Sequence, residues 1–306
     1  MERSGSNVKR VPFVDYLAFG EAITLETIAS KLDIAVQNGI RQITLESTLL
    51  SYLLDHMELY PKVLPLFSSR GIICRCAHGA WREGEEISLP FEGDRKRMLE
   101  RVAMTLKIAS EMGADTCSLH AESWFNPTYD PQPLENWRAY ILASLEELLP
   151  LAEELSIVIA LENIWGPPAM PDELCRIVEH FKSPWLGLCF DAGHANVISA
   201  SGLRSCGWMF GIWKHYGEVP WRDDTLDVML PHIVTAHLHD NDSSTDTHDL
   251  PGRGTIDWQV VVPKLMGAPR LRSIQSEVTG ELGYTRSQVW EAFRNVLPEE
   301  CFAFKQ

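Results

Sequence analysis

The sequence predicts a single-domain α/β protein, a closed (β/α)8 barrel of the TIM barrel type. Short apolar, β-branched runs alternate with stretches of helical periodicity along the whole 306-residue chain. This alternation continues without a break in composition, which indicates parallel strands joined by right-handed crossovers. An open doubly wound sheet is the alternative, but no Gly-rich phosphate-binding motif follows the first strand. Eight units in a chain of this length therefore favour the closed barrel.

The expected strands are short buried runs, and several end in an acidic residue or a histidine. The first is weak, and the third (IICRCAH) follows Gly71 at a turn. The fifth reads IVIALE and the sixth LGLCFD, so both are apolar until their last residue. The predicted strands are residues 11–17, 42–46, 72–78, 116–120, 157–162, 186–191, 233–239 and 271–278.

Stretches with the spacing of amphipathic helices separate these strands. Gly39 and Gly113 follow two of them, as glycine commonly does at helix C-termini, and Pro-Asp-Glu opens another. The predicted helices are residues 25–37, 49–67, 95–112, 137–155, 171–181, 258–266 and 286–296.

Two segments are expected outside this regular pattern. Residues 1–10 are polar and are expected to form a flexible N-terminal tail, so the barrel would occupy residues 11–306. A long aromatic loop insertion is expected at about residues 199–224. Loops of this length commonly act as lids or substrate walls, and a subunit contact is the alternative.

Composition limits the class of protein. The formal charge of −15 argues against broad nucleic-acid affinity, although a local basic patch is compatible with it. The seven cysteines form no CxxC pair and several lie in apolar runs, so we expect them to be reduced and buried in a cytoplasmic protein. The N-terminus has no apolar secretory segment, and no run approaches the ~18 apolar residues of a membrane span. A homo-oligomer is compatible with the sequence.

Acids and histidines stand at the carboxyl ends of the predicted strands, which converge at one end of a parallel barrel. Glu162, Asp191 and Glu277 end three strands, and His237 lies near the end of the seventh. None of these ends supplies a lysine or arginine. Because crowded carboxylates without a positive charge would be protonated or would destabilise the barrel, we predict one divalent metal ion (Mn, Mg, Co or Zn) and no nucleotide cofactor. Its predicted ligands are Glu162, Asp191, His237 and Glu277.

Further polar and aromatic residues near these ends are candidates for binding substrate. His194 follows Asp191 by one helical turn, and His239 lies two residues from His237 on the same face of the strand, so which of the two histidines is the ligand stays open. Glu46 is expected to be structural or to support the residues that bind the metal. The predicted substrate-binding residues are His78, His120, His194, His239, Trp165 and Arg253, and the predicted extra metal ligands are Asp246 and His248.

Five motifs resemble those of the xylose isomerase-like barrel superfamily, which includes sugar isomerases and epimerases, inosose and dehydroshikimate dehydratases and the endonuclease IV family. They are LEN (161–163), FDAGHAN (190–196), HLHDND (237–242), HDLPGRGTIDW (248–258) and SEV (276–278). The resemblance to the epimerase-like branch implies that the four predicted ligands bind one ion, that Glu162 and Glu277 act as acid and base, and that His194 contacts substrate. The endonuclease branch implies three zinc ions, with ligands matched here by His78, His120, Glu162, Asp191, His194, His237, Asp246, His248 and Glu277.

The predicted function is a divalent-metal-dependent isomerase or epimerase of a small-molecule sugar or polyol. Glu162 and Glu277 would remove and return a carbon-bound proton through a metal-stabilised enediolate. One alternative is a dehydratase of a keto-polyol, of the inosose or dehydroshikimate type. A second is an endonuclease IV-like hydrolase of abasic sites. The loops after the third and fourth predicted strands carry no clustered Lys or Arg, which counts against nucleic acid as a partner.

Overall fold

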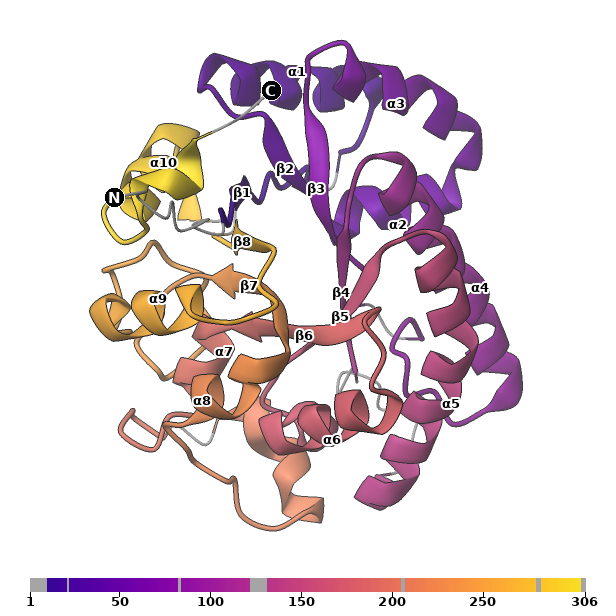
Figure 1. Cartoon of the computed structure of the whole chain (residues 1–306), viewed down its shortest axis with the longest axis vertical. Helices are drawn as coiled ribbons and strands as arrows, with labels where there is room; N and C mark the ends of the chain where they lie inside the picture. The colour runs from indigo at the N-terminus through magenta and orange to yellow at the C-terminus, as the bar shows by residue number, and fades with distance from the viewer. Residues whose placement is uncertain are drawn as a thin grey trace, which may run out of the picture.

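A computed structural model gives the fold and describes residues 10–20, 22–81, 84–121, 131–204, 207–278 and 282–303. Parallel strands close into a barrel in the order β1-β2-β3-β4-β5-β6-β7-β8. Figure 1 shows the strands inside and the helices around them. The predicted single-domain (β/α)8 fold is therefore confirmed. The expected tail lies almost entirely outside the described residues, which begin at Arg10.

The strands are short and mostly follow the prediction. Their bounds are β1 Phe13–Asp15, β2 Gln42–Leu45, β3 Ile73–His78, β4 Thr116–His120, β5 Val158–Glu162, β6 Leu186–Asp191, β7 Ile233–Leu238 and β8 Ser273–Ser276. β1 is shorter than expected because the backbone N–H of Tyr16 donates to the Ser276 hydroxyl, at 2.9 Å, instead of continuing the ladder.

Helices connect the strands on the outside of the barrel. The α-helices are α1 Leu25–Gln37, α2 Ser47–Asp55, α3 Tyr60–Ser68, α4 Glu92–Glu111, α5 Leu134–Glu154, α6 Pro171–Phe181, α7 Ala192–Val197, α8 Thr225–Met229, α9 Trp258–Met266 and α10 Arg286–Arg294. The 3-10 turns are η1 Met57–Leu59, η2 Pro167–Ala169, η3 Trp208–His215, η4 Leu230–His232 and η6 Glu299–Phe302. None of the described helices is long and apolar enough to cross a lipid bilayer.

The prediction of one helix over residues 49–67 is wrong, because the segment is divided into α2, η1 and α3. The chain leaves helical geometry at His56, and Pro61 lies in the first turn of α3, where its missing N–H costs no hydrogen bond. α2 begins earlier than expected because Glu46 caps it, accepting N–H groups from Thr48 at 2.6 Å and Leu49 at 3.0 Å. Glu46 is therefore structural, as the sequence predicted.

The aromatic insertion contains η3 as well as irregular chain. The indole N–H of Trp213 donates to the backbone oxygen of Trp165, at 2.8 Å. The hydroxyl of Tyr216 donates to the backbone oxygen of Gln132, at 2.6 Å. These bonds fasten the described part of the insertion to the segment after β5 and to the start of α5.

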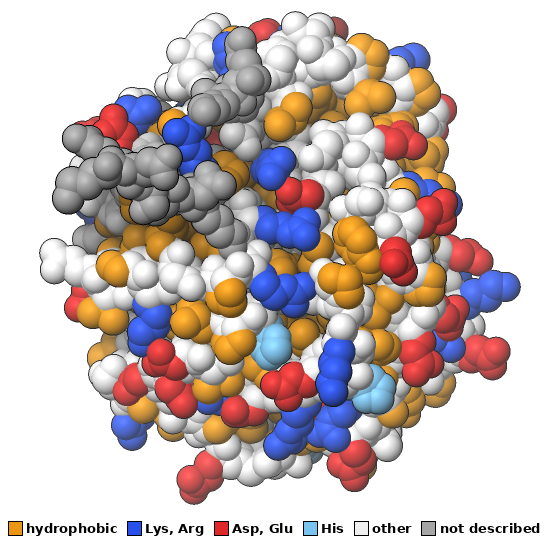
Figure 2. Space-filling model, in the orientation of Figure 1, with side chains coloured by type: hydrophobic (Ala, Val, Ile, Leu, Met, Phe, Trp, Pro, Cys, Tyr) orange, Lys and Arg blue, Asp and Glu red, His pale blue; other side chains and the backbone are white. Residues whose placement is uncertain are grey.

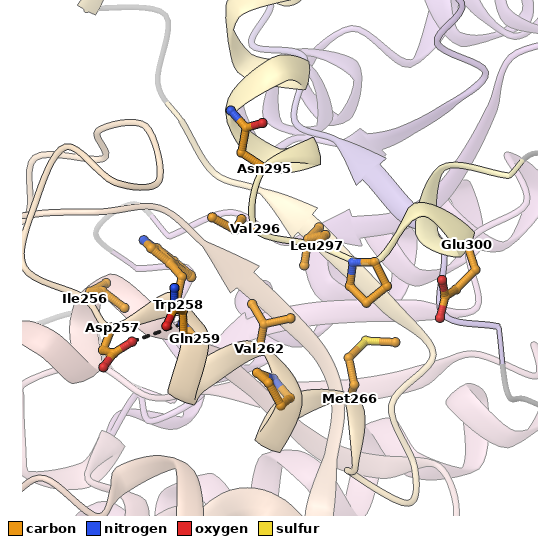
Figure 3. A pocket seen from close by; sticks show the side chains of 12 residues that line it. Ile256, Asp257, Trp258, Gln259, Val262, Met266, Asn295, Val296, Leu297 and Glu300 are labelled. Carbon is orange, nitrogen blue, oxygen red and sulfur yellow. Dashed lines mark hydrogen bonds between the residues drawn. The ribbon is translucent and has the colours of Figure 1, made fainter.

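A groove of about 830 Å³ lies between α9 and the residues that follow α10 (Figure 3). Much of its lining is apolar, including Trp258, Val262, Met266 and Leu297. The acids and histidines at the strand ends are not among its lining residues, so this groove is separate from the candidate site described below.

A buried ion pair joins the first and last units of the barrel. Asp15 is fully buried between β1 and α10, and Nη1 of Arg286 lies 3.3 and 3.4 Å from its two oxygens. Burial raises the pKa of Asp15, and Arg286 opposes that shift. The same guanidinium donates to the backbone oxygen of Tyr16, at 3.1 Å.

We expect Arg286→Met to lower the free energy of unfolding by about 3–5 kcal/mol, because it leaves a buried carboxylate without its partner. Urea unfolding measures this change. The control is Arg97→Met, which removes an exposed ion pair with Asp94 and should change stability little. Equal losses in the two variants would contradict the importance of burial here.

Candidate metal centre

The site residues are gathered by strand alternation and strand register. In β5, Val158 and Ala160 pack in a cluster with Cys189 of β6, and Glu162 lies on the same face because strand side chains alternate. Register then sets neighbours: His120 is opposite Glu162 across β4 and β5, and Asp191 is opposite His237 across β6 and β7. Residues far apart in the sequence are therefore adjacent at one end of the barrel.

His237 stands among three strand-end acids. Its Nδ1 lies 3.2 Å from Oε1 of Glu162 and 3.2 Å from Oε2 of Glu277. Oδ2 of Asp191 is 4.0 Å from the same nitrogen. The other ring nitrogen, Nε2, lies 3.2 Å from the Ser118 hydroxyl, which leaves Nδ1 facing the acids. The geometry thus brings together the four residues that the sequence predicted as ligands.

His78 and His120 lie on the other side of Glu162. Oε2 of Glu162 is 3.4 Å from Nε2 of His78 and 3.6 Å from Nε2 of His120. Nε2 of His78 is also 3.6 Å from Oε1 of Glu277. Because Nδ1 of His78 lies 2.7 Å from the backbone oxygen of Gly79, it is the Nε2 atom that can serve the site. Ligand atoms of His78, Glu162, His237 and Glu277 all lie within 4.8 Å of one another.

The donor atoms of this cluster fit a divalent ion. Both oxygens of Glu162, Oδ2 of Asp191, Oε2 of Glu277 and Nδ1 of His237 are buried and make no hydrogen bond with the described part of the chain. Within the described residues, these acids form ion pairs with histidines alone. Buried acceptors left without partners are costly, and imidazole plus carboxylate, without thiolate, suits Mn, Zn, Co, Fe or Mg.

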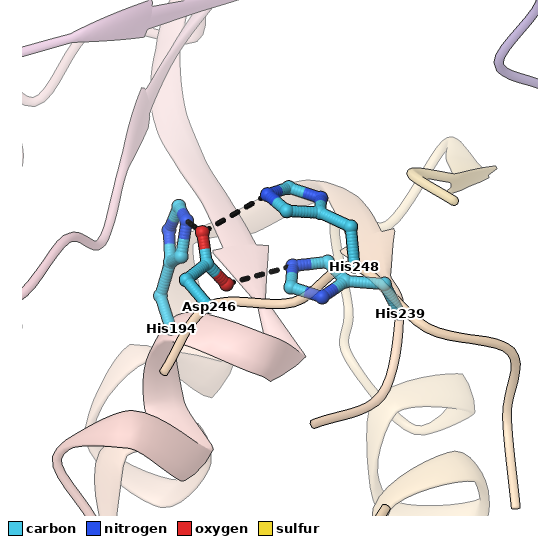
Figure 4. Close-up of side chains that lie close together, drawn as sticks. All are labelled: His194, His239, Asp246 and His248. Carbon is cyan, nitrogen blue, oxygen red and sulfur yellow. Dashed lines mark hydrogen bonds and ion pairs between the residues drawn. The ribbon is translucent and has the colours of Figure 1, made fainter. Parts of the chain in front are cut away.

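A second cluster lies beside the first and surrounds Asp246 (Figure 4). Oδ2 of Asp246 is 2.9 Å from Nε2 of His248 and 3.2 Å from Nε2 of His194. Its other oxygen, Oδ1, is 3.7 Å from Nε2 of His239. Ligand atoms of these four residues also lie within 4.8 Å of one another. His239 also lies 3.2 Å from Oδ1 of Asp191 through the same Nε2, so it stands between Asp191 and Asp246, whereas His237 faces the glutamates.

The loop that carries Asp246 and His248 is held by Asp240. The backbone groups of Asp240 and Asp249 bond in both directions, at 2.8 and 2.9 Å. The Asp240 carboxylate accepts the Gly252 N–H at 2.8 Å and the Trp258 indole N–H at 2.9 Å. These bonds explain the buried Asp240 and part of the HDLPGRGTIDW motif, since they fold the loop back over the end of the barrel.

The neighbouring charges shift the pKa of each group in the first cluster. Burial raises the pKa of Glu162, but His237, His120 and His78 outweigh it and hold the pKa well below its usual value. Burial also raises the pKa of Glu277, but nearby His237 outweighs burial, so this pKa is lowered as well. Burial lowers the pKa of His237, but Cys189, Glu162 and Glu277 raise it well above its usual value. When no cation is bound, protons on imidazole would compensate the acids.

The same competition operates in the second cluster. Burial lowers the pKa of His248, but Asp246 raises it to about 9. Burial also opposes the charged form of His194, and Asp191 and Asp246 outweigh it, so its pKa is well above its usual value. A divalent cation would take the place of these protons.

Of the remaining predicted residues, Trp165 lies beside the second cluster and Arg253 lies on the surface. Trp165 is buried, and its ring meets the His194 ring edge-on with centroids 5.0 Å apart, so it lies beside the second cluster. Arg253 is exposed on the turn after His248, and its role in substrate binding stays a prediction. The carboxylate of the adjacent Asp240 is directed away from His239 and accepts N–H groups of the loop instead.

Three residues at the site were not singled out from the sequence. Ser118 orients His237, as described above. Asn163 fixes Asp191 by bonding its backbone in both directions, at 2.8 and 3.0 Å. Tyr16 is buried, and burial together with nearby Glu46 and Glu277 raises its pKa well above the usual value. Only the LEN motif gave a signal, since Asn163 directly follows Glu162.

The fold and the strand-end side chains define the class as a (β/α)8 barrel with a buried histidine–carboxylate site. The chain belongs to the xylose isomerase-like TIM barrel family, whose model matches residues 62–269. This result confirms the resemblance that the five sequence motifs indicated.

Individual relatives are more distant. The uncharacterized protein MJ1311 of Methanocaldococcus jannaschii is 27% identical over 179 residues, which are 56% of this chain and 53% of that protein, so the match spans about half of the relative's length. The crystal structure of 3-keto-D-glucoside 4-epimerase, YcjR, from E. coli superposes with a TM-score of 0.67 at 15% identity, covering 94% of this chain and 99% of that one. D-psicose 3-epimerase from Clostridium cellulolyticum H10, with D-tagatose, gives 0.64 at 14% identity, covering 95% and 93%. At these identities the two structures show the shared fold.

We expect metal binding by the apo chain to release protons and to strengthen with pH. Ligating imidazoles must be neutral, whereas His194, His237 and His248 have raised pKa values. The apparent affinity for Zn²⁺ should therefore rise from about pH 6 toward the pKa of His248 at about 9. Calorimetry in buffers of different ionisation enthalpy counts the protons. An affinity that does not change with pH would contradict this assignment of ligands.

Proposed function

We propose that the protein is a divalent-metal-dependent isomerase or epimerase of a polyhydroxylated substrate, a sugar or polyol that carries a carbonyl group. The observation that supports this most directly is the pair of buried glutamates, Glu162 and Glu277, each 3.2 Å from Nδ1 of His237. The sugar epimerases that share the fold act on such substrates, as their names state. A bound divalent ion would supply Lewis-acid polarisation of the substrate carbonyl.

The protein's own residues would move the proton. Their low pKa values keep Glu162 and Glu277 ionised at neutral pH, so either can act as the base that removes a proton from the carbon beside the carbonyl. The group that returns a proton must first acquire one. His78 can carry it, since its Nε2 lies 3.4 Å from Glu162 and 3.6 Å from Glu277. Return to the opposite face gives an epimer, and return to the adjacent carbon gives an isomer.

We expect Glu277→Gln to reduce turnover by about 10²–10⁴-fold while the barrel stays folded, because an amide cannot accept the proton. Substrates would be found by following exchange of carbon-bound hydrogen with deuterated water across a panel of ketoses and keto-glycosides. Product analysis then separates a change of configuration from loss of water, the dehydratase outcome. The matched control, Glu179→Gln, changes a glutamate side chain that is 64% exposed. Full activity of Glu277→Gln on the identified substrate would refute the mechanism.

A second candidate is phosphodiester hydrolysis at abasic sites by several metal ions. The cluster around Asp246 favours it, because a single-ion isomerase does not require a second set of ligands beside the first. Figure 2 shows one face of the molecule on which Lys and Arg side chains follow one another across the middle, among scattered acids. The net charge of −15 therefore does not exclude a polyanionic partner.

Two assays, hydrogen exchange on sugars and cleavage of abasic DNA, separate the two functions. The isomerase predicts hydrogen exchange on a sugar and no cleavage of duplex DNA that contains an abasic site. The hydrolase predicts cleavage of that DNA, no exchange on sugars, and loss of cleavage in Asp246→Asn. Intact duplex of the same sequence is the control for contaminating nucleases.

A further inference from the structure

Arginines gather at the amino ends of the strands, which is the end of the barrel opposite the two clusters. We call this set the basic rim: Arg41 before β2, Arg75 near the start of β3, and Arg270 and Arg272 before β8. Because the strands of the barrel are parallel, their starts share one end. All four side chains are partly exposed. The chain therefore presents guanidinium groups at one end of the barrel and carboxylates with imidazoles at the other.

A bulge places Arg75 in the basic rim. The register between β2 and β3 shifts after Ile43, so Arg75 has no opposite residue in β2. Bulges of this kind redirect the side chain of the extra residue. Nη2 of Arg75 lies 2.8 Å from Oδ2 of Asp115, the residue that precedes β4.

Arg272 reaches across the end of the barrel. Its Nη1 donates to the backbone oxygen of Asp115, at 3.5 Å, although β8 and β4 stand on opposite sides in the order of the strands. Burial raises the pKa of Asp115, and the charges of Arg75 and Arg272 oppose that shift. One carboxylate therefore lies beside two guanidinium groups, which leaves this part of the rim positively charged.

The other contacts of the basic rim are with neutral carbonyl groups. Nη1 of Arg41 donates to two backbone oxygens, at 3.0 and 3.2 Å. Nη2 of Arg270 donates to the backbone oxygen of Pro184, at 2.9 Å. Among the residues that the structure describes, no ion pair joins Arg41, Arg270 or Arg272 to a carboxylate. Each is held through one nitrogen, and because a guanidinium has five N–H donors, further donors remain for a ligand.

The basic rim also brings like charges together. Burial lowers the pKa of Arg270, and the charge of Arg272 lowers it further. The strands β1 to β8 run clockwise in Figure 1, which is the view from their amino ends when the crossovers are right-handed. Figure 2 has the same orientation and shows Lys and Arg side chains following one another across the middle. A bound anion would relieve the repulsion between such charges.

Structural contacts explain the basic rim only in part. Residues at this end of a barrel commonly contribute to stability, and the carbonyl contacts account for one nitrogen of each arginine. The formal charge of the chain is −15, and it pairs other arginines with acids, such as Arg70 with Asp33 and Arg95 with Glu147. An acidic protein that leaves adjacent arginines without carboxylates keeps these donors for another molecule.

We propose that the basic rim binds a compact anion that carries several phosphate groups. Planar guanidinium groups bind phosphate oxygens in pairs. The donors come from the starts of β2, β3 and β8 around one end of the barrel, which suits a ligand with several closely spaced charges. This site lies at the end opposite the metal centre, so the inference goes beyond the proposed isomerase and does not depend on it.

The experiment is calorimetric titration of the full-length chain with inorganic triphosphate, in buffer with EDTA so that no metal ion holds the ligand. We expect binding that weakens as salt rises, and much weaker binding of orthophosphate. Arg41→Gln and Arg270→Gln should each weaken triphosphate binding by at least about 10-fold, because each removes charge-assisted hydrogen bonds. Both residues bond only to carbonyl groups within the described chain, so either variant decides the result if the other does not fold.

Matched variants test the chemistry of the donors. Arg41→Lys keeps the charge but loses the planar fork, so its affinity should lie between those of the wild type and Arg41→Gln. Arg253→Gln changes an exposed arginine at the other end of the barrel and should leave the affinity unchanged.

A competing single-stranded oligonucleotide distinguishes two sources of phosphate. If it displaces triphosphate and depends on Arg41 and Arg270, the site accepts the backbone of a nucleic acid. If it does not, the ligand is a free oligophosphate. Either result supports the site.

Three results would overturn the inference. The first is a wild-type chain that binds no triphosphate. The second is binding that both Arg41→Gln and Arg270→Gln leave unchanged. The third is a polyglutamate peptide that binds as tightly as triphosphate, which would refute the choice of phosphate. None of these results affects the proposed function, which hydrogen exchange on sugars tests separately.

Discussion

The constraint on which the rest of the structure depends is the burial of three carboxylates at one end of the barrel. Glu162, Asp191 and Glu277 are at most 6% exposed, and in the described part of the chain their ion-pair partners are imidazoles. Buried acids in contact repel one another unless a proton or a cation lies between them. When no cation is bound, protons on histidines with raised pKa values would compensate the acids, and a divalent ion would do so more completely.

The barrel can accommodate this cluster because strand pairing and neighbouring neutral side chains hold its members in place. Strand register sets which side chains meet, and neutral groups below the site orient the rings, as the Ser118 hydroxyl does for His237. The second cluster is built differently. Its Asp246 and His248 come from a loop that Asp240 holds in place through backbone and indole N–H groups. One site therefore depends on the sheet and the other on a loop folded over it, and loops are where related barrels differ.

Membership in the xylose isomerase-like family establishes the fold, whereas the reaction depends on the side chains of the site. The two clusters together contain enough candidate ligands for more than one ion, whereas the sequence predicted a single ion. His78 is central to both interpretations, because its Nε2 lies between Glu162 and Glu277. It can pass a proton between the glutamates or add a nitrogen to a metal site. The close contact of carboxylates and imidazoles is thus suited to proton transfer and to metal binding.

The sequence by itself determined the fold class and the strand ends and predicted which residues gather in the first cluster, because those follow from local rules. Two-residue alternation and parallel pairing place Glu162, Asp191 and His237 at one end of any such barrel. The division of the helix at His56 was missed, since the apolar period continues across the break. Only the tertiary structure decided that His239 lies between Asp191 and Asp246, because ring orientation depends on contacts between segments distant in sequence. The close approach of Gly193 to that ring is one such contact, and no local pattern encodes it.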